Sequence, residues 1–311
     1  MNKIQVGNAP CSWGTLEFEG LETNPIGYRQ MLDELVATGY TATELGDWGF
    51  LPTEPASLRD EIEARRLVML GAYVQAAFSK PEAHAPACLE VLKVARLLAA
   101  AAPADKPYLI LADDNASDPV RAQHAGRATA DISLSAEGWR VFTKGVQEVA
   151  RKVREETGLP VLFHHHCAGF VETPWELDTF LDLTDPALVN FVFDTGHYVF
   201  GAGLQGPGSD GDLAAVLNHY KERIAYVHFK DCHPGIVAQA RREEWEYLTS
   251  LRHGVFCELG QGCVDFPGVV KWLRQRDYRG WVLVEQDVLP GMGTPKDSAQ
   301  RNRDYLRSIG L

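Results

Sequence analysis

Three consecutive histidines occur in the stretch FHHHCAGFVETPWEL, which covers residues 163 to 177. The apolar run before them predicts a strand. Side chains alternate between the two faces of a strand, so His164 and His166 are expected on one face and His165 on the other. The imidazole ring both ligates metal ions and transfers protons near neutral pH. Glu172 follows six residues after His166 and adds a carboxylate that suits either task.

Side chains of metal-ligand types recur where the later strands are predicted to end. The run 189 to 197 ends in Asp194 and His197, the run 224 to 231 carries His228, Lys230 and Asp231, and the run 280 to 287 ends in Glu285 and Asp287. A lone buried histidine is more often a hydrogen-bonded core residue than a ligand, but four successive strands that end in Asp, Glu or His favour a divalent metal site. Oxygen-rich ligation with one or two imidazoles suits Mn²⁺, Co²⁺, Mg²⁺ or Fe²⁺ better than a structural zinc, which prefers thiolates.

An alternation of strands and helices has to bring these side chains together. Short apolar runs alternate with stretches of helical periodicity along the chain, which is typical of repeated strand-helix units. Strands are predicted at 4 to 10, 41 to 46, 67 to 75, 107 to 114, 160 to 166, 189 to 197, 224 to 231 and 280 to 287. Eight parallel strands, with no Gly-x-Gly-x-x-Gly after the first, favour a single α/β domain over residues 1–311, a (β/α)8 TIM barrel, in place of a doubly wound sheet. The carboxyl ends of its strands converge on one pocket.

Helices are predicted between these strands. They cover 24 to 39, 55 to 66 with Ser57 as N-cap, 86 to 102, 135 to 158 with Ser135 as cap and Gly158 as end, 172 to 184, 212 to 223, and 266 to 277. Two segments, 112 to 134 and 232 to 266, break the alternation after a strand, so we expect them to be lids or substrate loops on the functional face.

The composition narrows the class of protein. Apolar residues make up 45% of the 311 residues, which is ordinary for a globular chain, and the net charge of −12 argues against a nucleic-acid surface. The six cysteines lack zinc-ribbon spacing and are too few for a disulfide scaffold, so we expect reduced thiols. The sequence predicts neither a signal peptide nor a membrane span, and therefore a cytoplasmic protein.

Several motifs resemble the xylose isomerase-like TIM-barrel superfamily of sugar isomerases and epimerases, in particular its inosose dehydratase branch. They are NAPCSWG near the start, FHHHCAGFVETPWEL, DPALVNFVFDTGHYVFGAG, RIAYVHFKD and GWVLVEQD. The resemblance implies removal of water from 2-keto-myo-inositol with Mn²⁺ or Co²⁺, with Mg²⁺, Fe²⁺ or Zn²⁺ as alternatives. It implies the metal ligands Glu172, Asp194, His228 and Glu285. At the end of the fifth strand, where epimerases have a glutamate, this sequence has His164, so either His164 coordinates or Glu172 reaches back from its loop.

The remaining polar residues receive roles in the reaction. His166 is expected to be the acid or base, His197 to contact a substrate hydroxyl or orient the site, and Lys230 to neutralise a developing oxyanion. His164 could instead contact substrate. Glu44 and Trp13, near the ends of the second and first strands, are candidates for polyol contacts, although a Trp is as often a core residue.

Other functions remain open at this stage. The same metal site would serve a sugar or keto-acid isomerase or epimerase. A metal-dependent endonuclease is disfavoured by the acidic charge. A non-catalytic barrel that binds a polyol is disfavoured because competent residues occupy all the later strand ends. Barrels of this family often associate, so the resemblance also implies a homo-oligomer.

Overall fold

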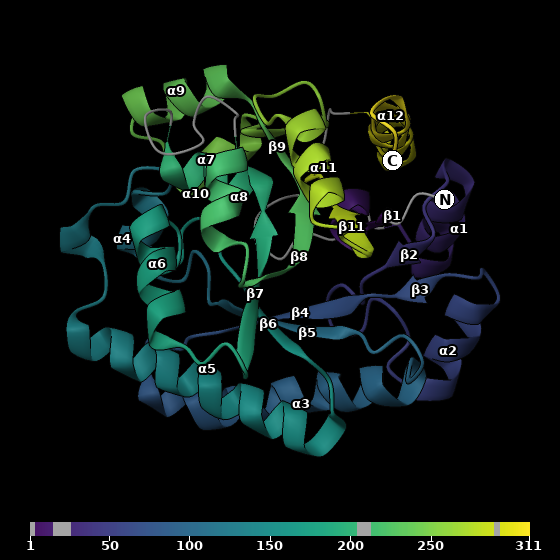
Figure 1. Cartoon of the computed structure of the whole chain (residues 1–311), viewed down its shortest axis with the longest axis horizontal. Coiled ribbons are helices and arrows are strands. Elements are labelled where there is room, and N and C mark those ends of the chain that lie inside the picture. Colours follow the sequence, from purple (N-terminus) through teal and green to yellow (C-terminus); the bar gives the residue numbers. More distant parts are fainter. Residues whose placement is uncertain (1–3, 15–25, 204–212, 289–292) are drawn as a thin grey trace.

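The computed structural model describes residues 4–14, 26–203, 213–288 and 293–311. Its centre is a curled parallel sheet with the strand order β1-β11-β8-β7-β6-β5-β4 (Figure 1). The short strands β2 and β3 pair with each other and close the ring between β1 and β4, since Thr41 N–H donates to the Val6 carbonyl and Leu45 N–H to the Gly71 carbonyl. The barrel strands are β1 (Ile4–Asn8), β2 (Ala42–Thr43), β3 (Val68–Met69), β4 (Gly71–Ala76), β5 (Tyr108–Asp113), β6 (Val161–His164), β7 (Val189–Asp194), β8 (Ile224–Phe229) and β11 (Gly280–Val284).

This arrangement confirms the predicted barrel, with β3 and β4 sharing one strand position because only Leu70 separates them. Several strands are shorter than predicted. β6 ends at His164, and β7 ends at Asp194 because helix α7 (Thr195–Ala202) begins at the next residue. His166 and His197 therefore lie just beyond strands, on the loop and helix that follow them.

Helices cover the outside of the barrel in Figure 1, with α3 and α5 side by side along one edge. The helices that follow the predicted pattern are α1 (Tyr28–Thr38), α2 (Pro55–Glu63), α3 (His84–Ala101), α5 (Ala136–Thr157), α6 (Pro174–Leu183), α8 (Ala214–Tyr220) and α11 (Phe266–Gln275). The predicted ends of α5 are confirmed: the Ser135 hydroxyl accepts the Gly138 N–H, and Gly158 closes the helix with a φ of 71°. The predicted cap of α2 is wrong. Glu54 caps it by accepting the N–H groups of Ala56 and Ser57, because Pro55 already starts the helix.

The C-terminal helix α12 (Pro295–Ser308) was not predicted. It packs against α1, and the Tyr40 hydroxyl donates to the Ala299 carbonyl beneath it.

The apolar side chains of the strands divide between two layers. Inside the barrel lies a small cluster that includes Leu70, Ile110, Leu162, Val192 and Leu283. A much larger cluster fills the space between the barrel and the helices and takes the residues next in sequence, such as Phe163 and Phe193. Inward and outward positions alternate along each strand, so residues that follow an inward apolar residue by two positions also face the barrel axis.

The two irregular segments contain structure of their own. The first holds α4 (Pro119–Gln123), and the second holds β9 (Asp231–Cys232), α9 (Pro234–Arg242), α10 (Tyr247–Arg252) and β10 (Phe256–Cys257). β9 and β10 form an antiparallel pair. The Asp231 carboxylate then ties the end of this segment down by accepting backbone N–H groups from Cys232, Gly260, Gly262 and Val264.

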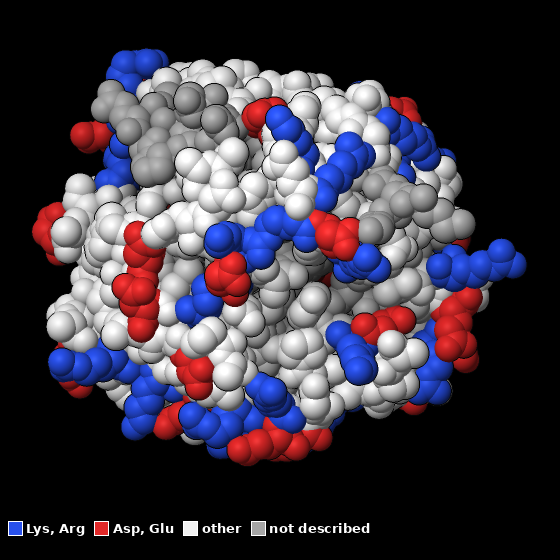
Figure 2. All heavy atoms as spheres, viewed as in Figure 1, with Lys and Arg blue, Asp and Glu red and all other residues white. Residues whose placement is uncertain are grey.

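Charges of both signs alternate over the described residues of the face seen in Figure 2, which carries no continuous basic surface. None of the described helices has the length and apolar character that crossing a bilayer requires.

Candidate metal centre and active site

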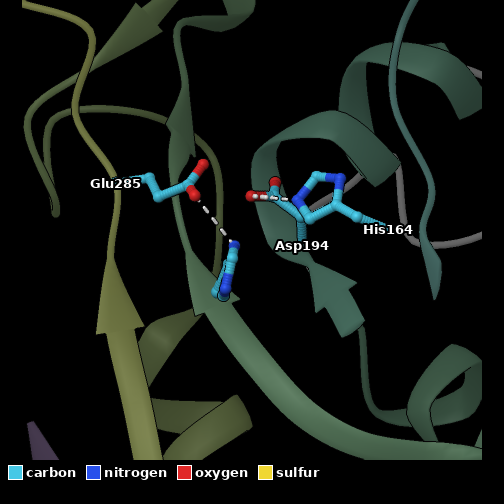
Figure 3. A group of neighbouring side chains, drawn as sticks. His164, Asp194 and Glu285 are labelled. Carbon is cyan, nitrogen blue, oxygen red and sulfur yellow. Dashed lines mark ion pairs between the residues drawn. The ribbon is translucent and has the colours of Figure 1, made fainter. Parts of the chain in front are cut away.

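Four side chains at the carboxyl ends of neighbouring strands form one cluster. They are His164 at the end of β6, Asp194 at the end of β7, His228 in β8 and Glu285 directly after β11. One potential ligand atom from each lies within 4.8 Å of the others. Figure 3 shows the His164 ring and the carboxylates of Asp194 and Glu285 pointing toward one another. Glu285 is 15% exposed and the other three are buried, so the cluster meets solvent on one side only.

The strand register explains why these residues meet. Leu162 and Tyr226 face the inside of the barrel, and His164 and His228 follow them by two positions, which is the period of a strand. Asp194 is the direct partner of His228 in the pairing of β7 with β8.

The two oxygens of Asp194 have different surroundings. Oδ1 caps α7 by accepting the His197 N–H at 2.7 Å. Oδ2 lies 3.7 Å from His164 Nε2 and has no hydrogen-bond donor among the described residues. Leaving a buried carboxylate oxygen without a donor costs free energy that a bound cation removes. The orphaned oxygen therefore fits a divalent metal, and two imidazoles with two carboxylates form a donor set suited to Mn²⁺, Co²⁺, Fe²⁺ or Zn²⁺.

The protonation of the two histidines differs. Burial and the charge of His228 lower the pKa of His164 to about 3, so His164 is a neutral imidazole. Burial also acts to lower the pKa of His228, but Glu285, 3.0 Å from Nδ1, and Glu44, 3.2 Å from Nε2, outweigh it and raise that pKa to about 10. A metal ion on the cluster has to displace a proton from this group.

Glu172 lies apart from the cluster. Its carboxylate accepts the N–H groups of Ala168 at 2.6 Å and Gly126 at 2.7 Å. Burial raises the pKa of Glu172 to about 7, with Arg121 opposing that rise. This corrects the expectation that Glu172 reaches back to the metal, because two backbone donors hold it in its loop. Of the two candidates for the fifth strand, His164 is the one that the structure brings to the cluster.

His165 faces the helices, as predicted. Its Nε2 accepts the Asp194 N–H at 3.1 Å, and its ring packs against Phe193 and Tyr198. The middle histidine thus supports the backbone beside the cluster.

His166 and His197 lie in close ring contact beside the cluster, with ring centroids 3.8 Å apart and the ring planes tilted by 37°. Burial lowers the pKa of His166 to about 3 and that of His197 well below its ordinary value, so both rings are neutral near pH 7 and each carries one proton.

The backbone of Cys167 determines where those protons lie. The carbonyl of Cys167 is 2.7 Å from His166 Nδ1, which must donate to it, so the lone pair of His166 is on Nε2. The N–H of Cys167 donates to His197 Nδ1 at 3.4 Å, so the proton of His197 is on Nε2. The hydrogen bonds to the backbone of Cys167 therefore favour opposite tautomers in the two rings.

Lys230 completes this side of the site. Its Nζ lies 3.4 Å from His197 Nε2, 3.5 Å from a Glu285 oxygen and 3.3 Å from an Asp287 oxygen. Burial acts against the charged ammonium, but Asp287, Glu285 and Asp194 outweigh it and hold the pKa of Lys230 well above its ordinary value. Asp287 had no predicted role. Its position two residues after Glu285, and hence on the same side of the chain, was the available signal.

The family model for the xylose isomerase-like TIM barrel matches residues 32–309. The chain belongs to this family. It is 29% identical to the inosose dehydratase of Geobacillus kaustophilus over 98% of this chain and 94% of that protein, and 30% identical to the inosose dehydratase of Bacillus velezensis over 97% and 95%. The crystal structure of the probable 3-DHS dehydratase AsbF from Bacillus anthracis superposes with a TM-score of 0.66 at 11% identity, over 98% of this chain and 99% of that one, which shows a shared fold.

The two candidates for polyol contacts, Glu44 and Trp13, have different surroundings. Glu44 is buried and contacts His228, as described above. Trp13 is buried in the layer between barrel and helices, and its indole N–H donates to Glu34 of α1. The structure therefore does not bring Trp13 to the cluster, because the polar end of its ring is held outside the barrel.

The segment 232–266 supplies walls of the site, in line with the prediction for it. The Tyr247 ring meets His166 at a centroid distance of 5.7 Å, and the Phe256 ring meets His197 at 4.8 Å. The segment 112–134 contributes a buried ion pair that the sequence did not suggest: Arg121 donates to Glu176 of α6 at 2.9 Å and to the Gly169 carbonyl. The ion pair joins α4 to α6, and the bond to Gly169 joins α4 to the loop after β6.

Proposed function

We propose that the protein is a metal-dependent lyase that dehydrates a cyclic keto-polyol such as 2-keto-myo-inositol. The observation that carries the proposal is the close His166–His197 pair beside the four-residue cluster, because one neutral ring offers a lone pair and the other offers a proton. Relatives named inosose dehydratase, similar over nearly the whole chain, support the same reaction.

His164, Asp194, His228 and Glu285 would hold the metal, for which we propose Mn²⁺ or Co²⁺. When bound, such a cation supplies Lewis-acid polarisation of the substrate ketone and makes the neighbouring C–H more acidic. His164 then acts as a ligand, and its alternative role in substrate contact is not needed.

Removal of water requires one base and one acid. His166 takes the proton from the carbon next to the ketone through the lone pair on Nε2. His197 gives the proton on Nε2 to the hydroxyl on the following carbon, so the C–O bond breaks and water leaves while a carbon–carbon double bond forms. The resulting enol rearranges to a dione, so the substrate is neither oxidised nor reduced overall.

Lys230 has a supporting electrostatic role. The contact of 3.4 Å between Lys230 and His197 joins two groups that are both hydrogen-bond donors. A substrate oxygen that accepts from both would relieve this mismatch, and the positive charge of Lys230 would stabilise the oxyanion that develops after proton removal.

A sugar or keto-sugar isomerase or epimerase is the second candidate. It would use the same cluster and the same proton abstraction, but return the proton to the opposite face or the adjacent carbon. A small polyol or sugar is the substrate class in either case. A cytoplasmic location, a homo-oligomer and the absence of a nucleic-acid partner stay predictions.

Proton NMR in D₂O separates the two candidates. The Mn²⁺-loaded protein is incubated with 2-keto-myo-inositol and, separately, with a panel of ketohexoses, beside the Asp194→Ala variant. Loss of water to a dione, absent in the variant, is the expected result. Deuterium exchange or stereochemical change on a ketose, with the inosose unchanged, would overturn the dehydratase and favour the epimerase.

A further inference from the structure

Glu44 lies across the barrel from the cluster. The four cluster residues come from β6, β7, β8 and the end of β11, whereas Glu44 follows β2. Its carboxylate nevertheless reaches through the barrel interior to His228, with 3.2 Å between Oε1 and Nε2. Both side chains are buried.

The ring of His228 has one carboxylate at each nitrogen. Glu285 lies 3.0 Å from Nδ1 and belongs to the cluster, while Glu44 lies 3.2 Å from Nε2 and does not. A neutral imidazole has one lone pair and one N–H, so a histidine that gives its lone pair to a metal needs an acceptor for the N–H on its other nitrogen. Glu44 is in place to be that acceptor.

The carboxylate of Glu44 interacts with two side chains, those of His228 and Tyr226. Among the described residues, His228 is its only ion-pair partner, and the side chain is 4% exposed. A buried carboxylate is costly unless a donor or cation compensates it. The Tyr226 ring packs edge-on against His228 beside this contact, with ring centroids 5.0 Å apart at an interplanar angle of 84°.

We propose that Glu44 is a positioning residue that orients His228 for metal binding, and not a substrate contact. This inference rests on the proposed function insofar as the cluster must bind a divalent metal. Loss of an outer-shell carboxylate partner of this kind typically weakens metal affinity by about 10- to 100-fold.

The test compares metal binding by the full-length wild-type protein, Glu44→Gln and Glu44→Ala. Each is stripped with a chelator and titrated with Mn²⁺, with bound ion followed by electron paramagnetic resonance. The Co²⁺-loaded proteins are compared by their visible absorption, which reports ligand geometry independently of turnover. Glu258→Gln serves as the matched control, because Glu258 is also a buried glutamate but pairs with Arg301.

We expect Glu44→Gln to raise the dissociation constant for Mn²⁺ about tenfold and Glu44→Ala more, with an altered Co²⁺ spectrum. Glu258→Gln should match the wild type in both. Glu44→Gln keeps the size of the side chain, so it gives the answer if Glu44→Ala does not fold. Mn²⁺ binding by Glu44→Gln within about twofold of wild type, with a raised KM for substrate, would overturn the inference and return Glu44 to substrate contact. A wild-type protein that binds no divalent metal would instead overturn the proposed function, and the role of Glu44 with it.

Discussion

The imidazoles of His166 and His197 lie with their centroids 3.8 Å apart and their planes tilted by 37°, and both contact the backbone of Cys167. The Cys167 carbonyl accepts a hydrogen bond from His166, and the Cys167 N–H donates one to His197. The two histidines therefore differ in which ring nitrogen carries the proton. The lowered pKa of each keeps both rings neutral near pH 7.

This difference predicts distinct defects for two variants. His166→Gln should lose both α-proton exchange and water loss, because the base is absent. In His197→Gln, the rate of water loss should fall by about 10²- to 10⁴-fold while α-proton exchange continues, because only the acid is missing. Proton NMR in D₂O measures both events in one sample. Equal loss of exchange and dehydration in His197→Gln would contradict this division of roles.

Metal affinity should rise with pH. The pKa of His228 is raised to about 10, so its proton is present at neutral pH in the metal-free protein and must leave when a metal binds. One released proton corresponds to roughly a tenfold gain in affinity per pH unit below that value. Calorimetric titration with Mn²⁺ in two buffers of different ionisation enthalpy counts the protons released. A dissociation constant that does not change between about pH 6 and pH 9 would show that His228 takes no part.

Glu172→Gln should show that Glu172 stabilises the fold and does not bind the metal. The substitution places an amide NH₂ opposite one of the two backbone N–H groups that Glu172 accepts, so we expect the free energy of unfolding to fall by about 1–3 kcal/mol. Mn²⁺ affinity should stay within about twofold of wild type, whereas Asp194→Asn should lose measurable binding. Urea unfolding and Mn²⁺ titration of the same preparations check both statements, and a large loss of affinity in Glu172→Gln would restore it as a ligand.

The Arg121–Glu176 pair should matter for stability because both side chains are fully buried. Arg121→Met leaves the Glu176 carboxylate without its cation, and breaking a buried pair in this way costs about 3–5 kcal/mol. The double variant Arg121→Met/Glu176→Gln should recover part of this loss, since the uncompensated charge is gone. Urea unfolding of the two variants tests this, and equal stability of the single variant and wild type would contradict it. The exposed pair Arg140–Glu137 provides the control, where removal of the arginine should cost less than about 1 kcal/mol.

Strand periodicity accounts for most of what the sequence predicted at the site. Asp194, His228 and Glu285 were grouped because they lie near the ends of successive strands, the family resemblance implied that they are ligands, and the period of two turned His165 outward. The choice between His164 and Glu172 could not be made in this way. It depends on a donor, the N–H of Gly126, that lies 46 residues away in sequence.

Contacts between residues far apart in the sequence also explain the other surroundings that were not predicted. Glu44 and Asp287 were visible as acidic residues near strand ends, but Glu44 meets His228 of β8 and Asp287 meets Lys230, which directly follows β8. The burial of Trp13 depends on α1, because Glu34 of that helix accepts the hydrogen bond from the indole N–H of Trp13. Local patterns predict which way a side chain points, whereas tertiary contacts decide which group it meets.

The histidine triplet has a consequence for genetic experiments. His164 faces the cluster, His165 supports the Asp194 backbone and His166 lies on His197, so the three identical residues occupy three different environments. Deleting any one of their codons yields the same polypeptide, with two histidines between Phe163 and Cys167. A deletion screen therefore cannot assign a role to any of them. Such a deletion would also shift the residues after the triplet by one position relative to β7. Only substitution, one position at a time, distinguishes the three.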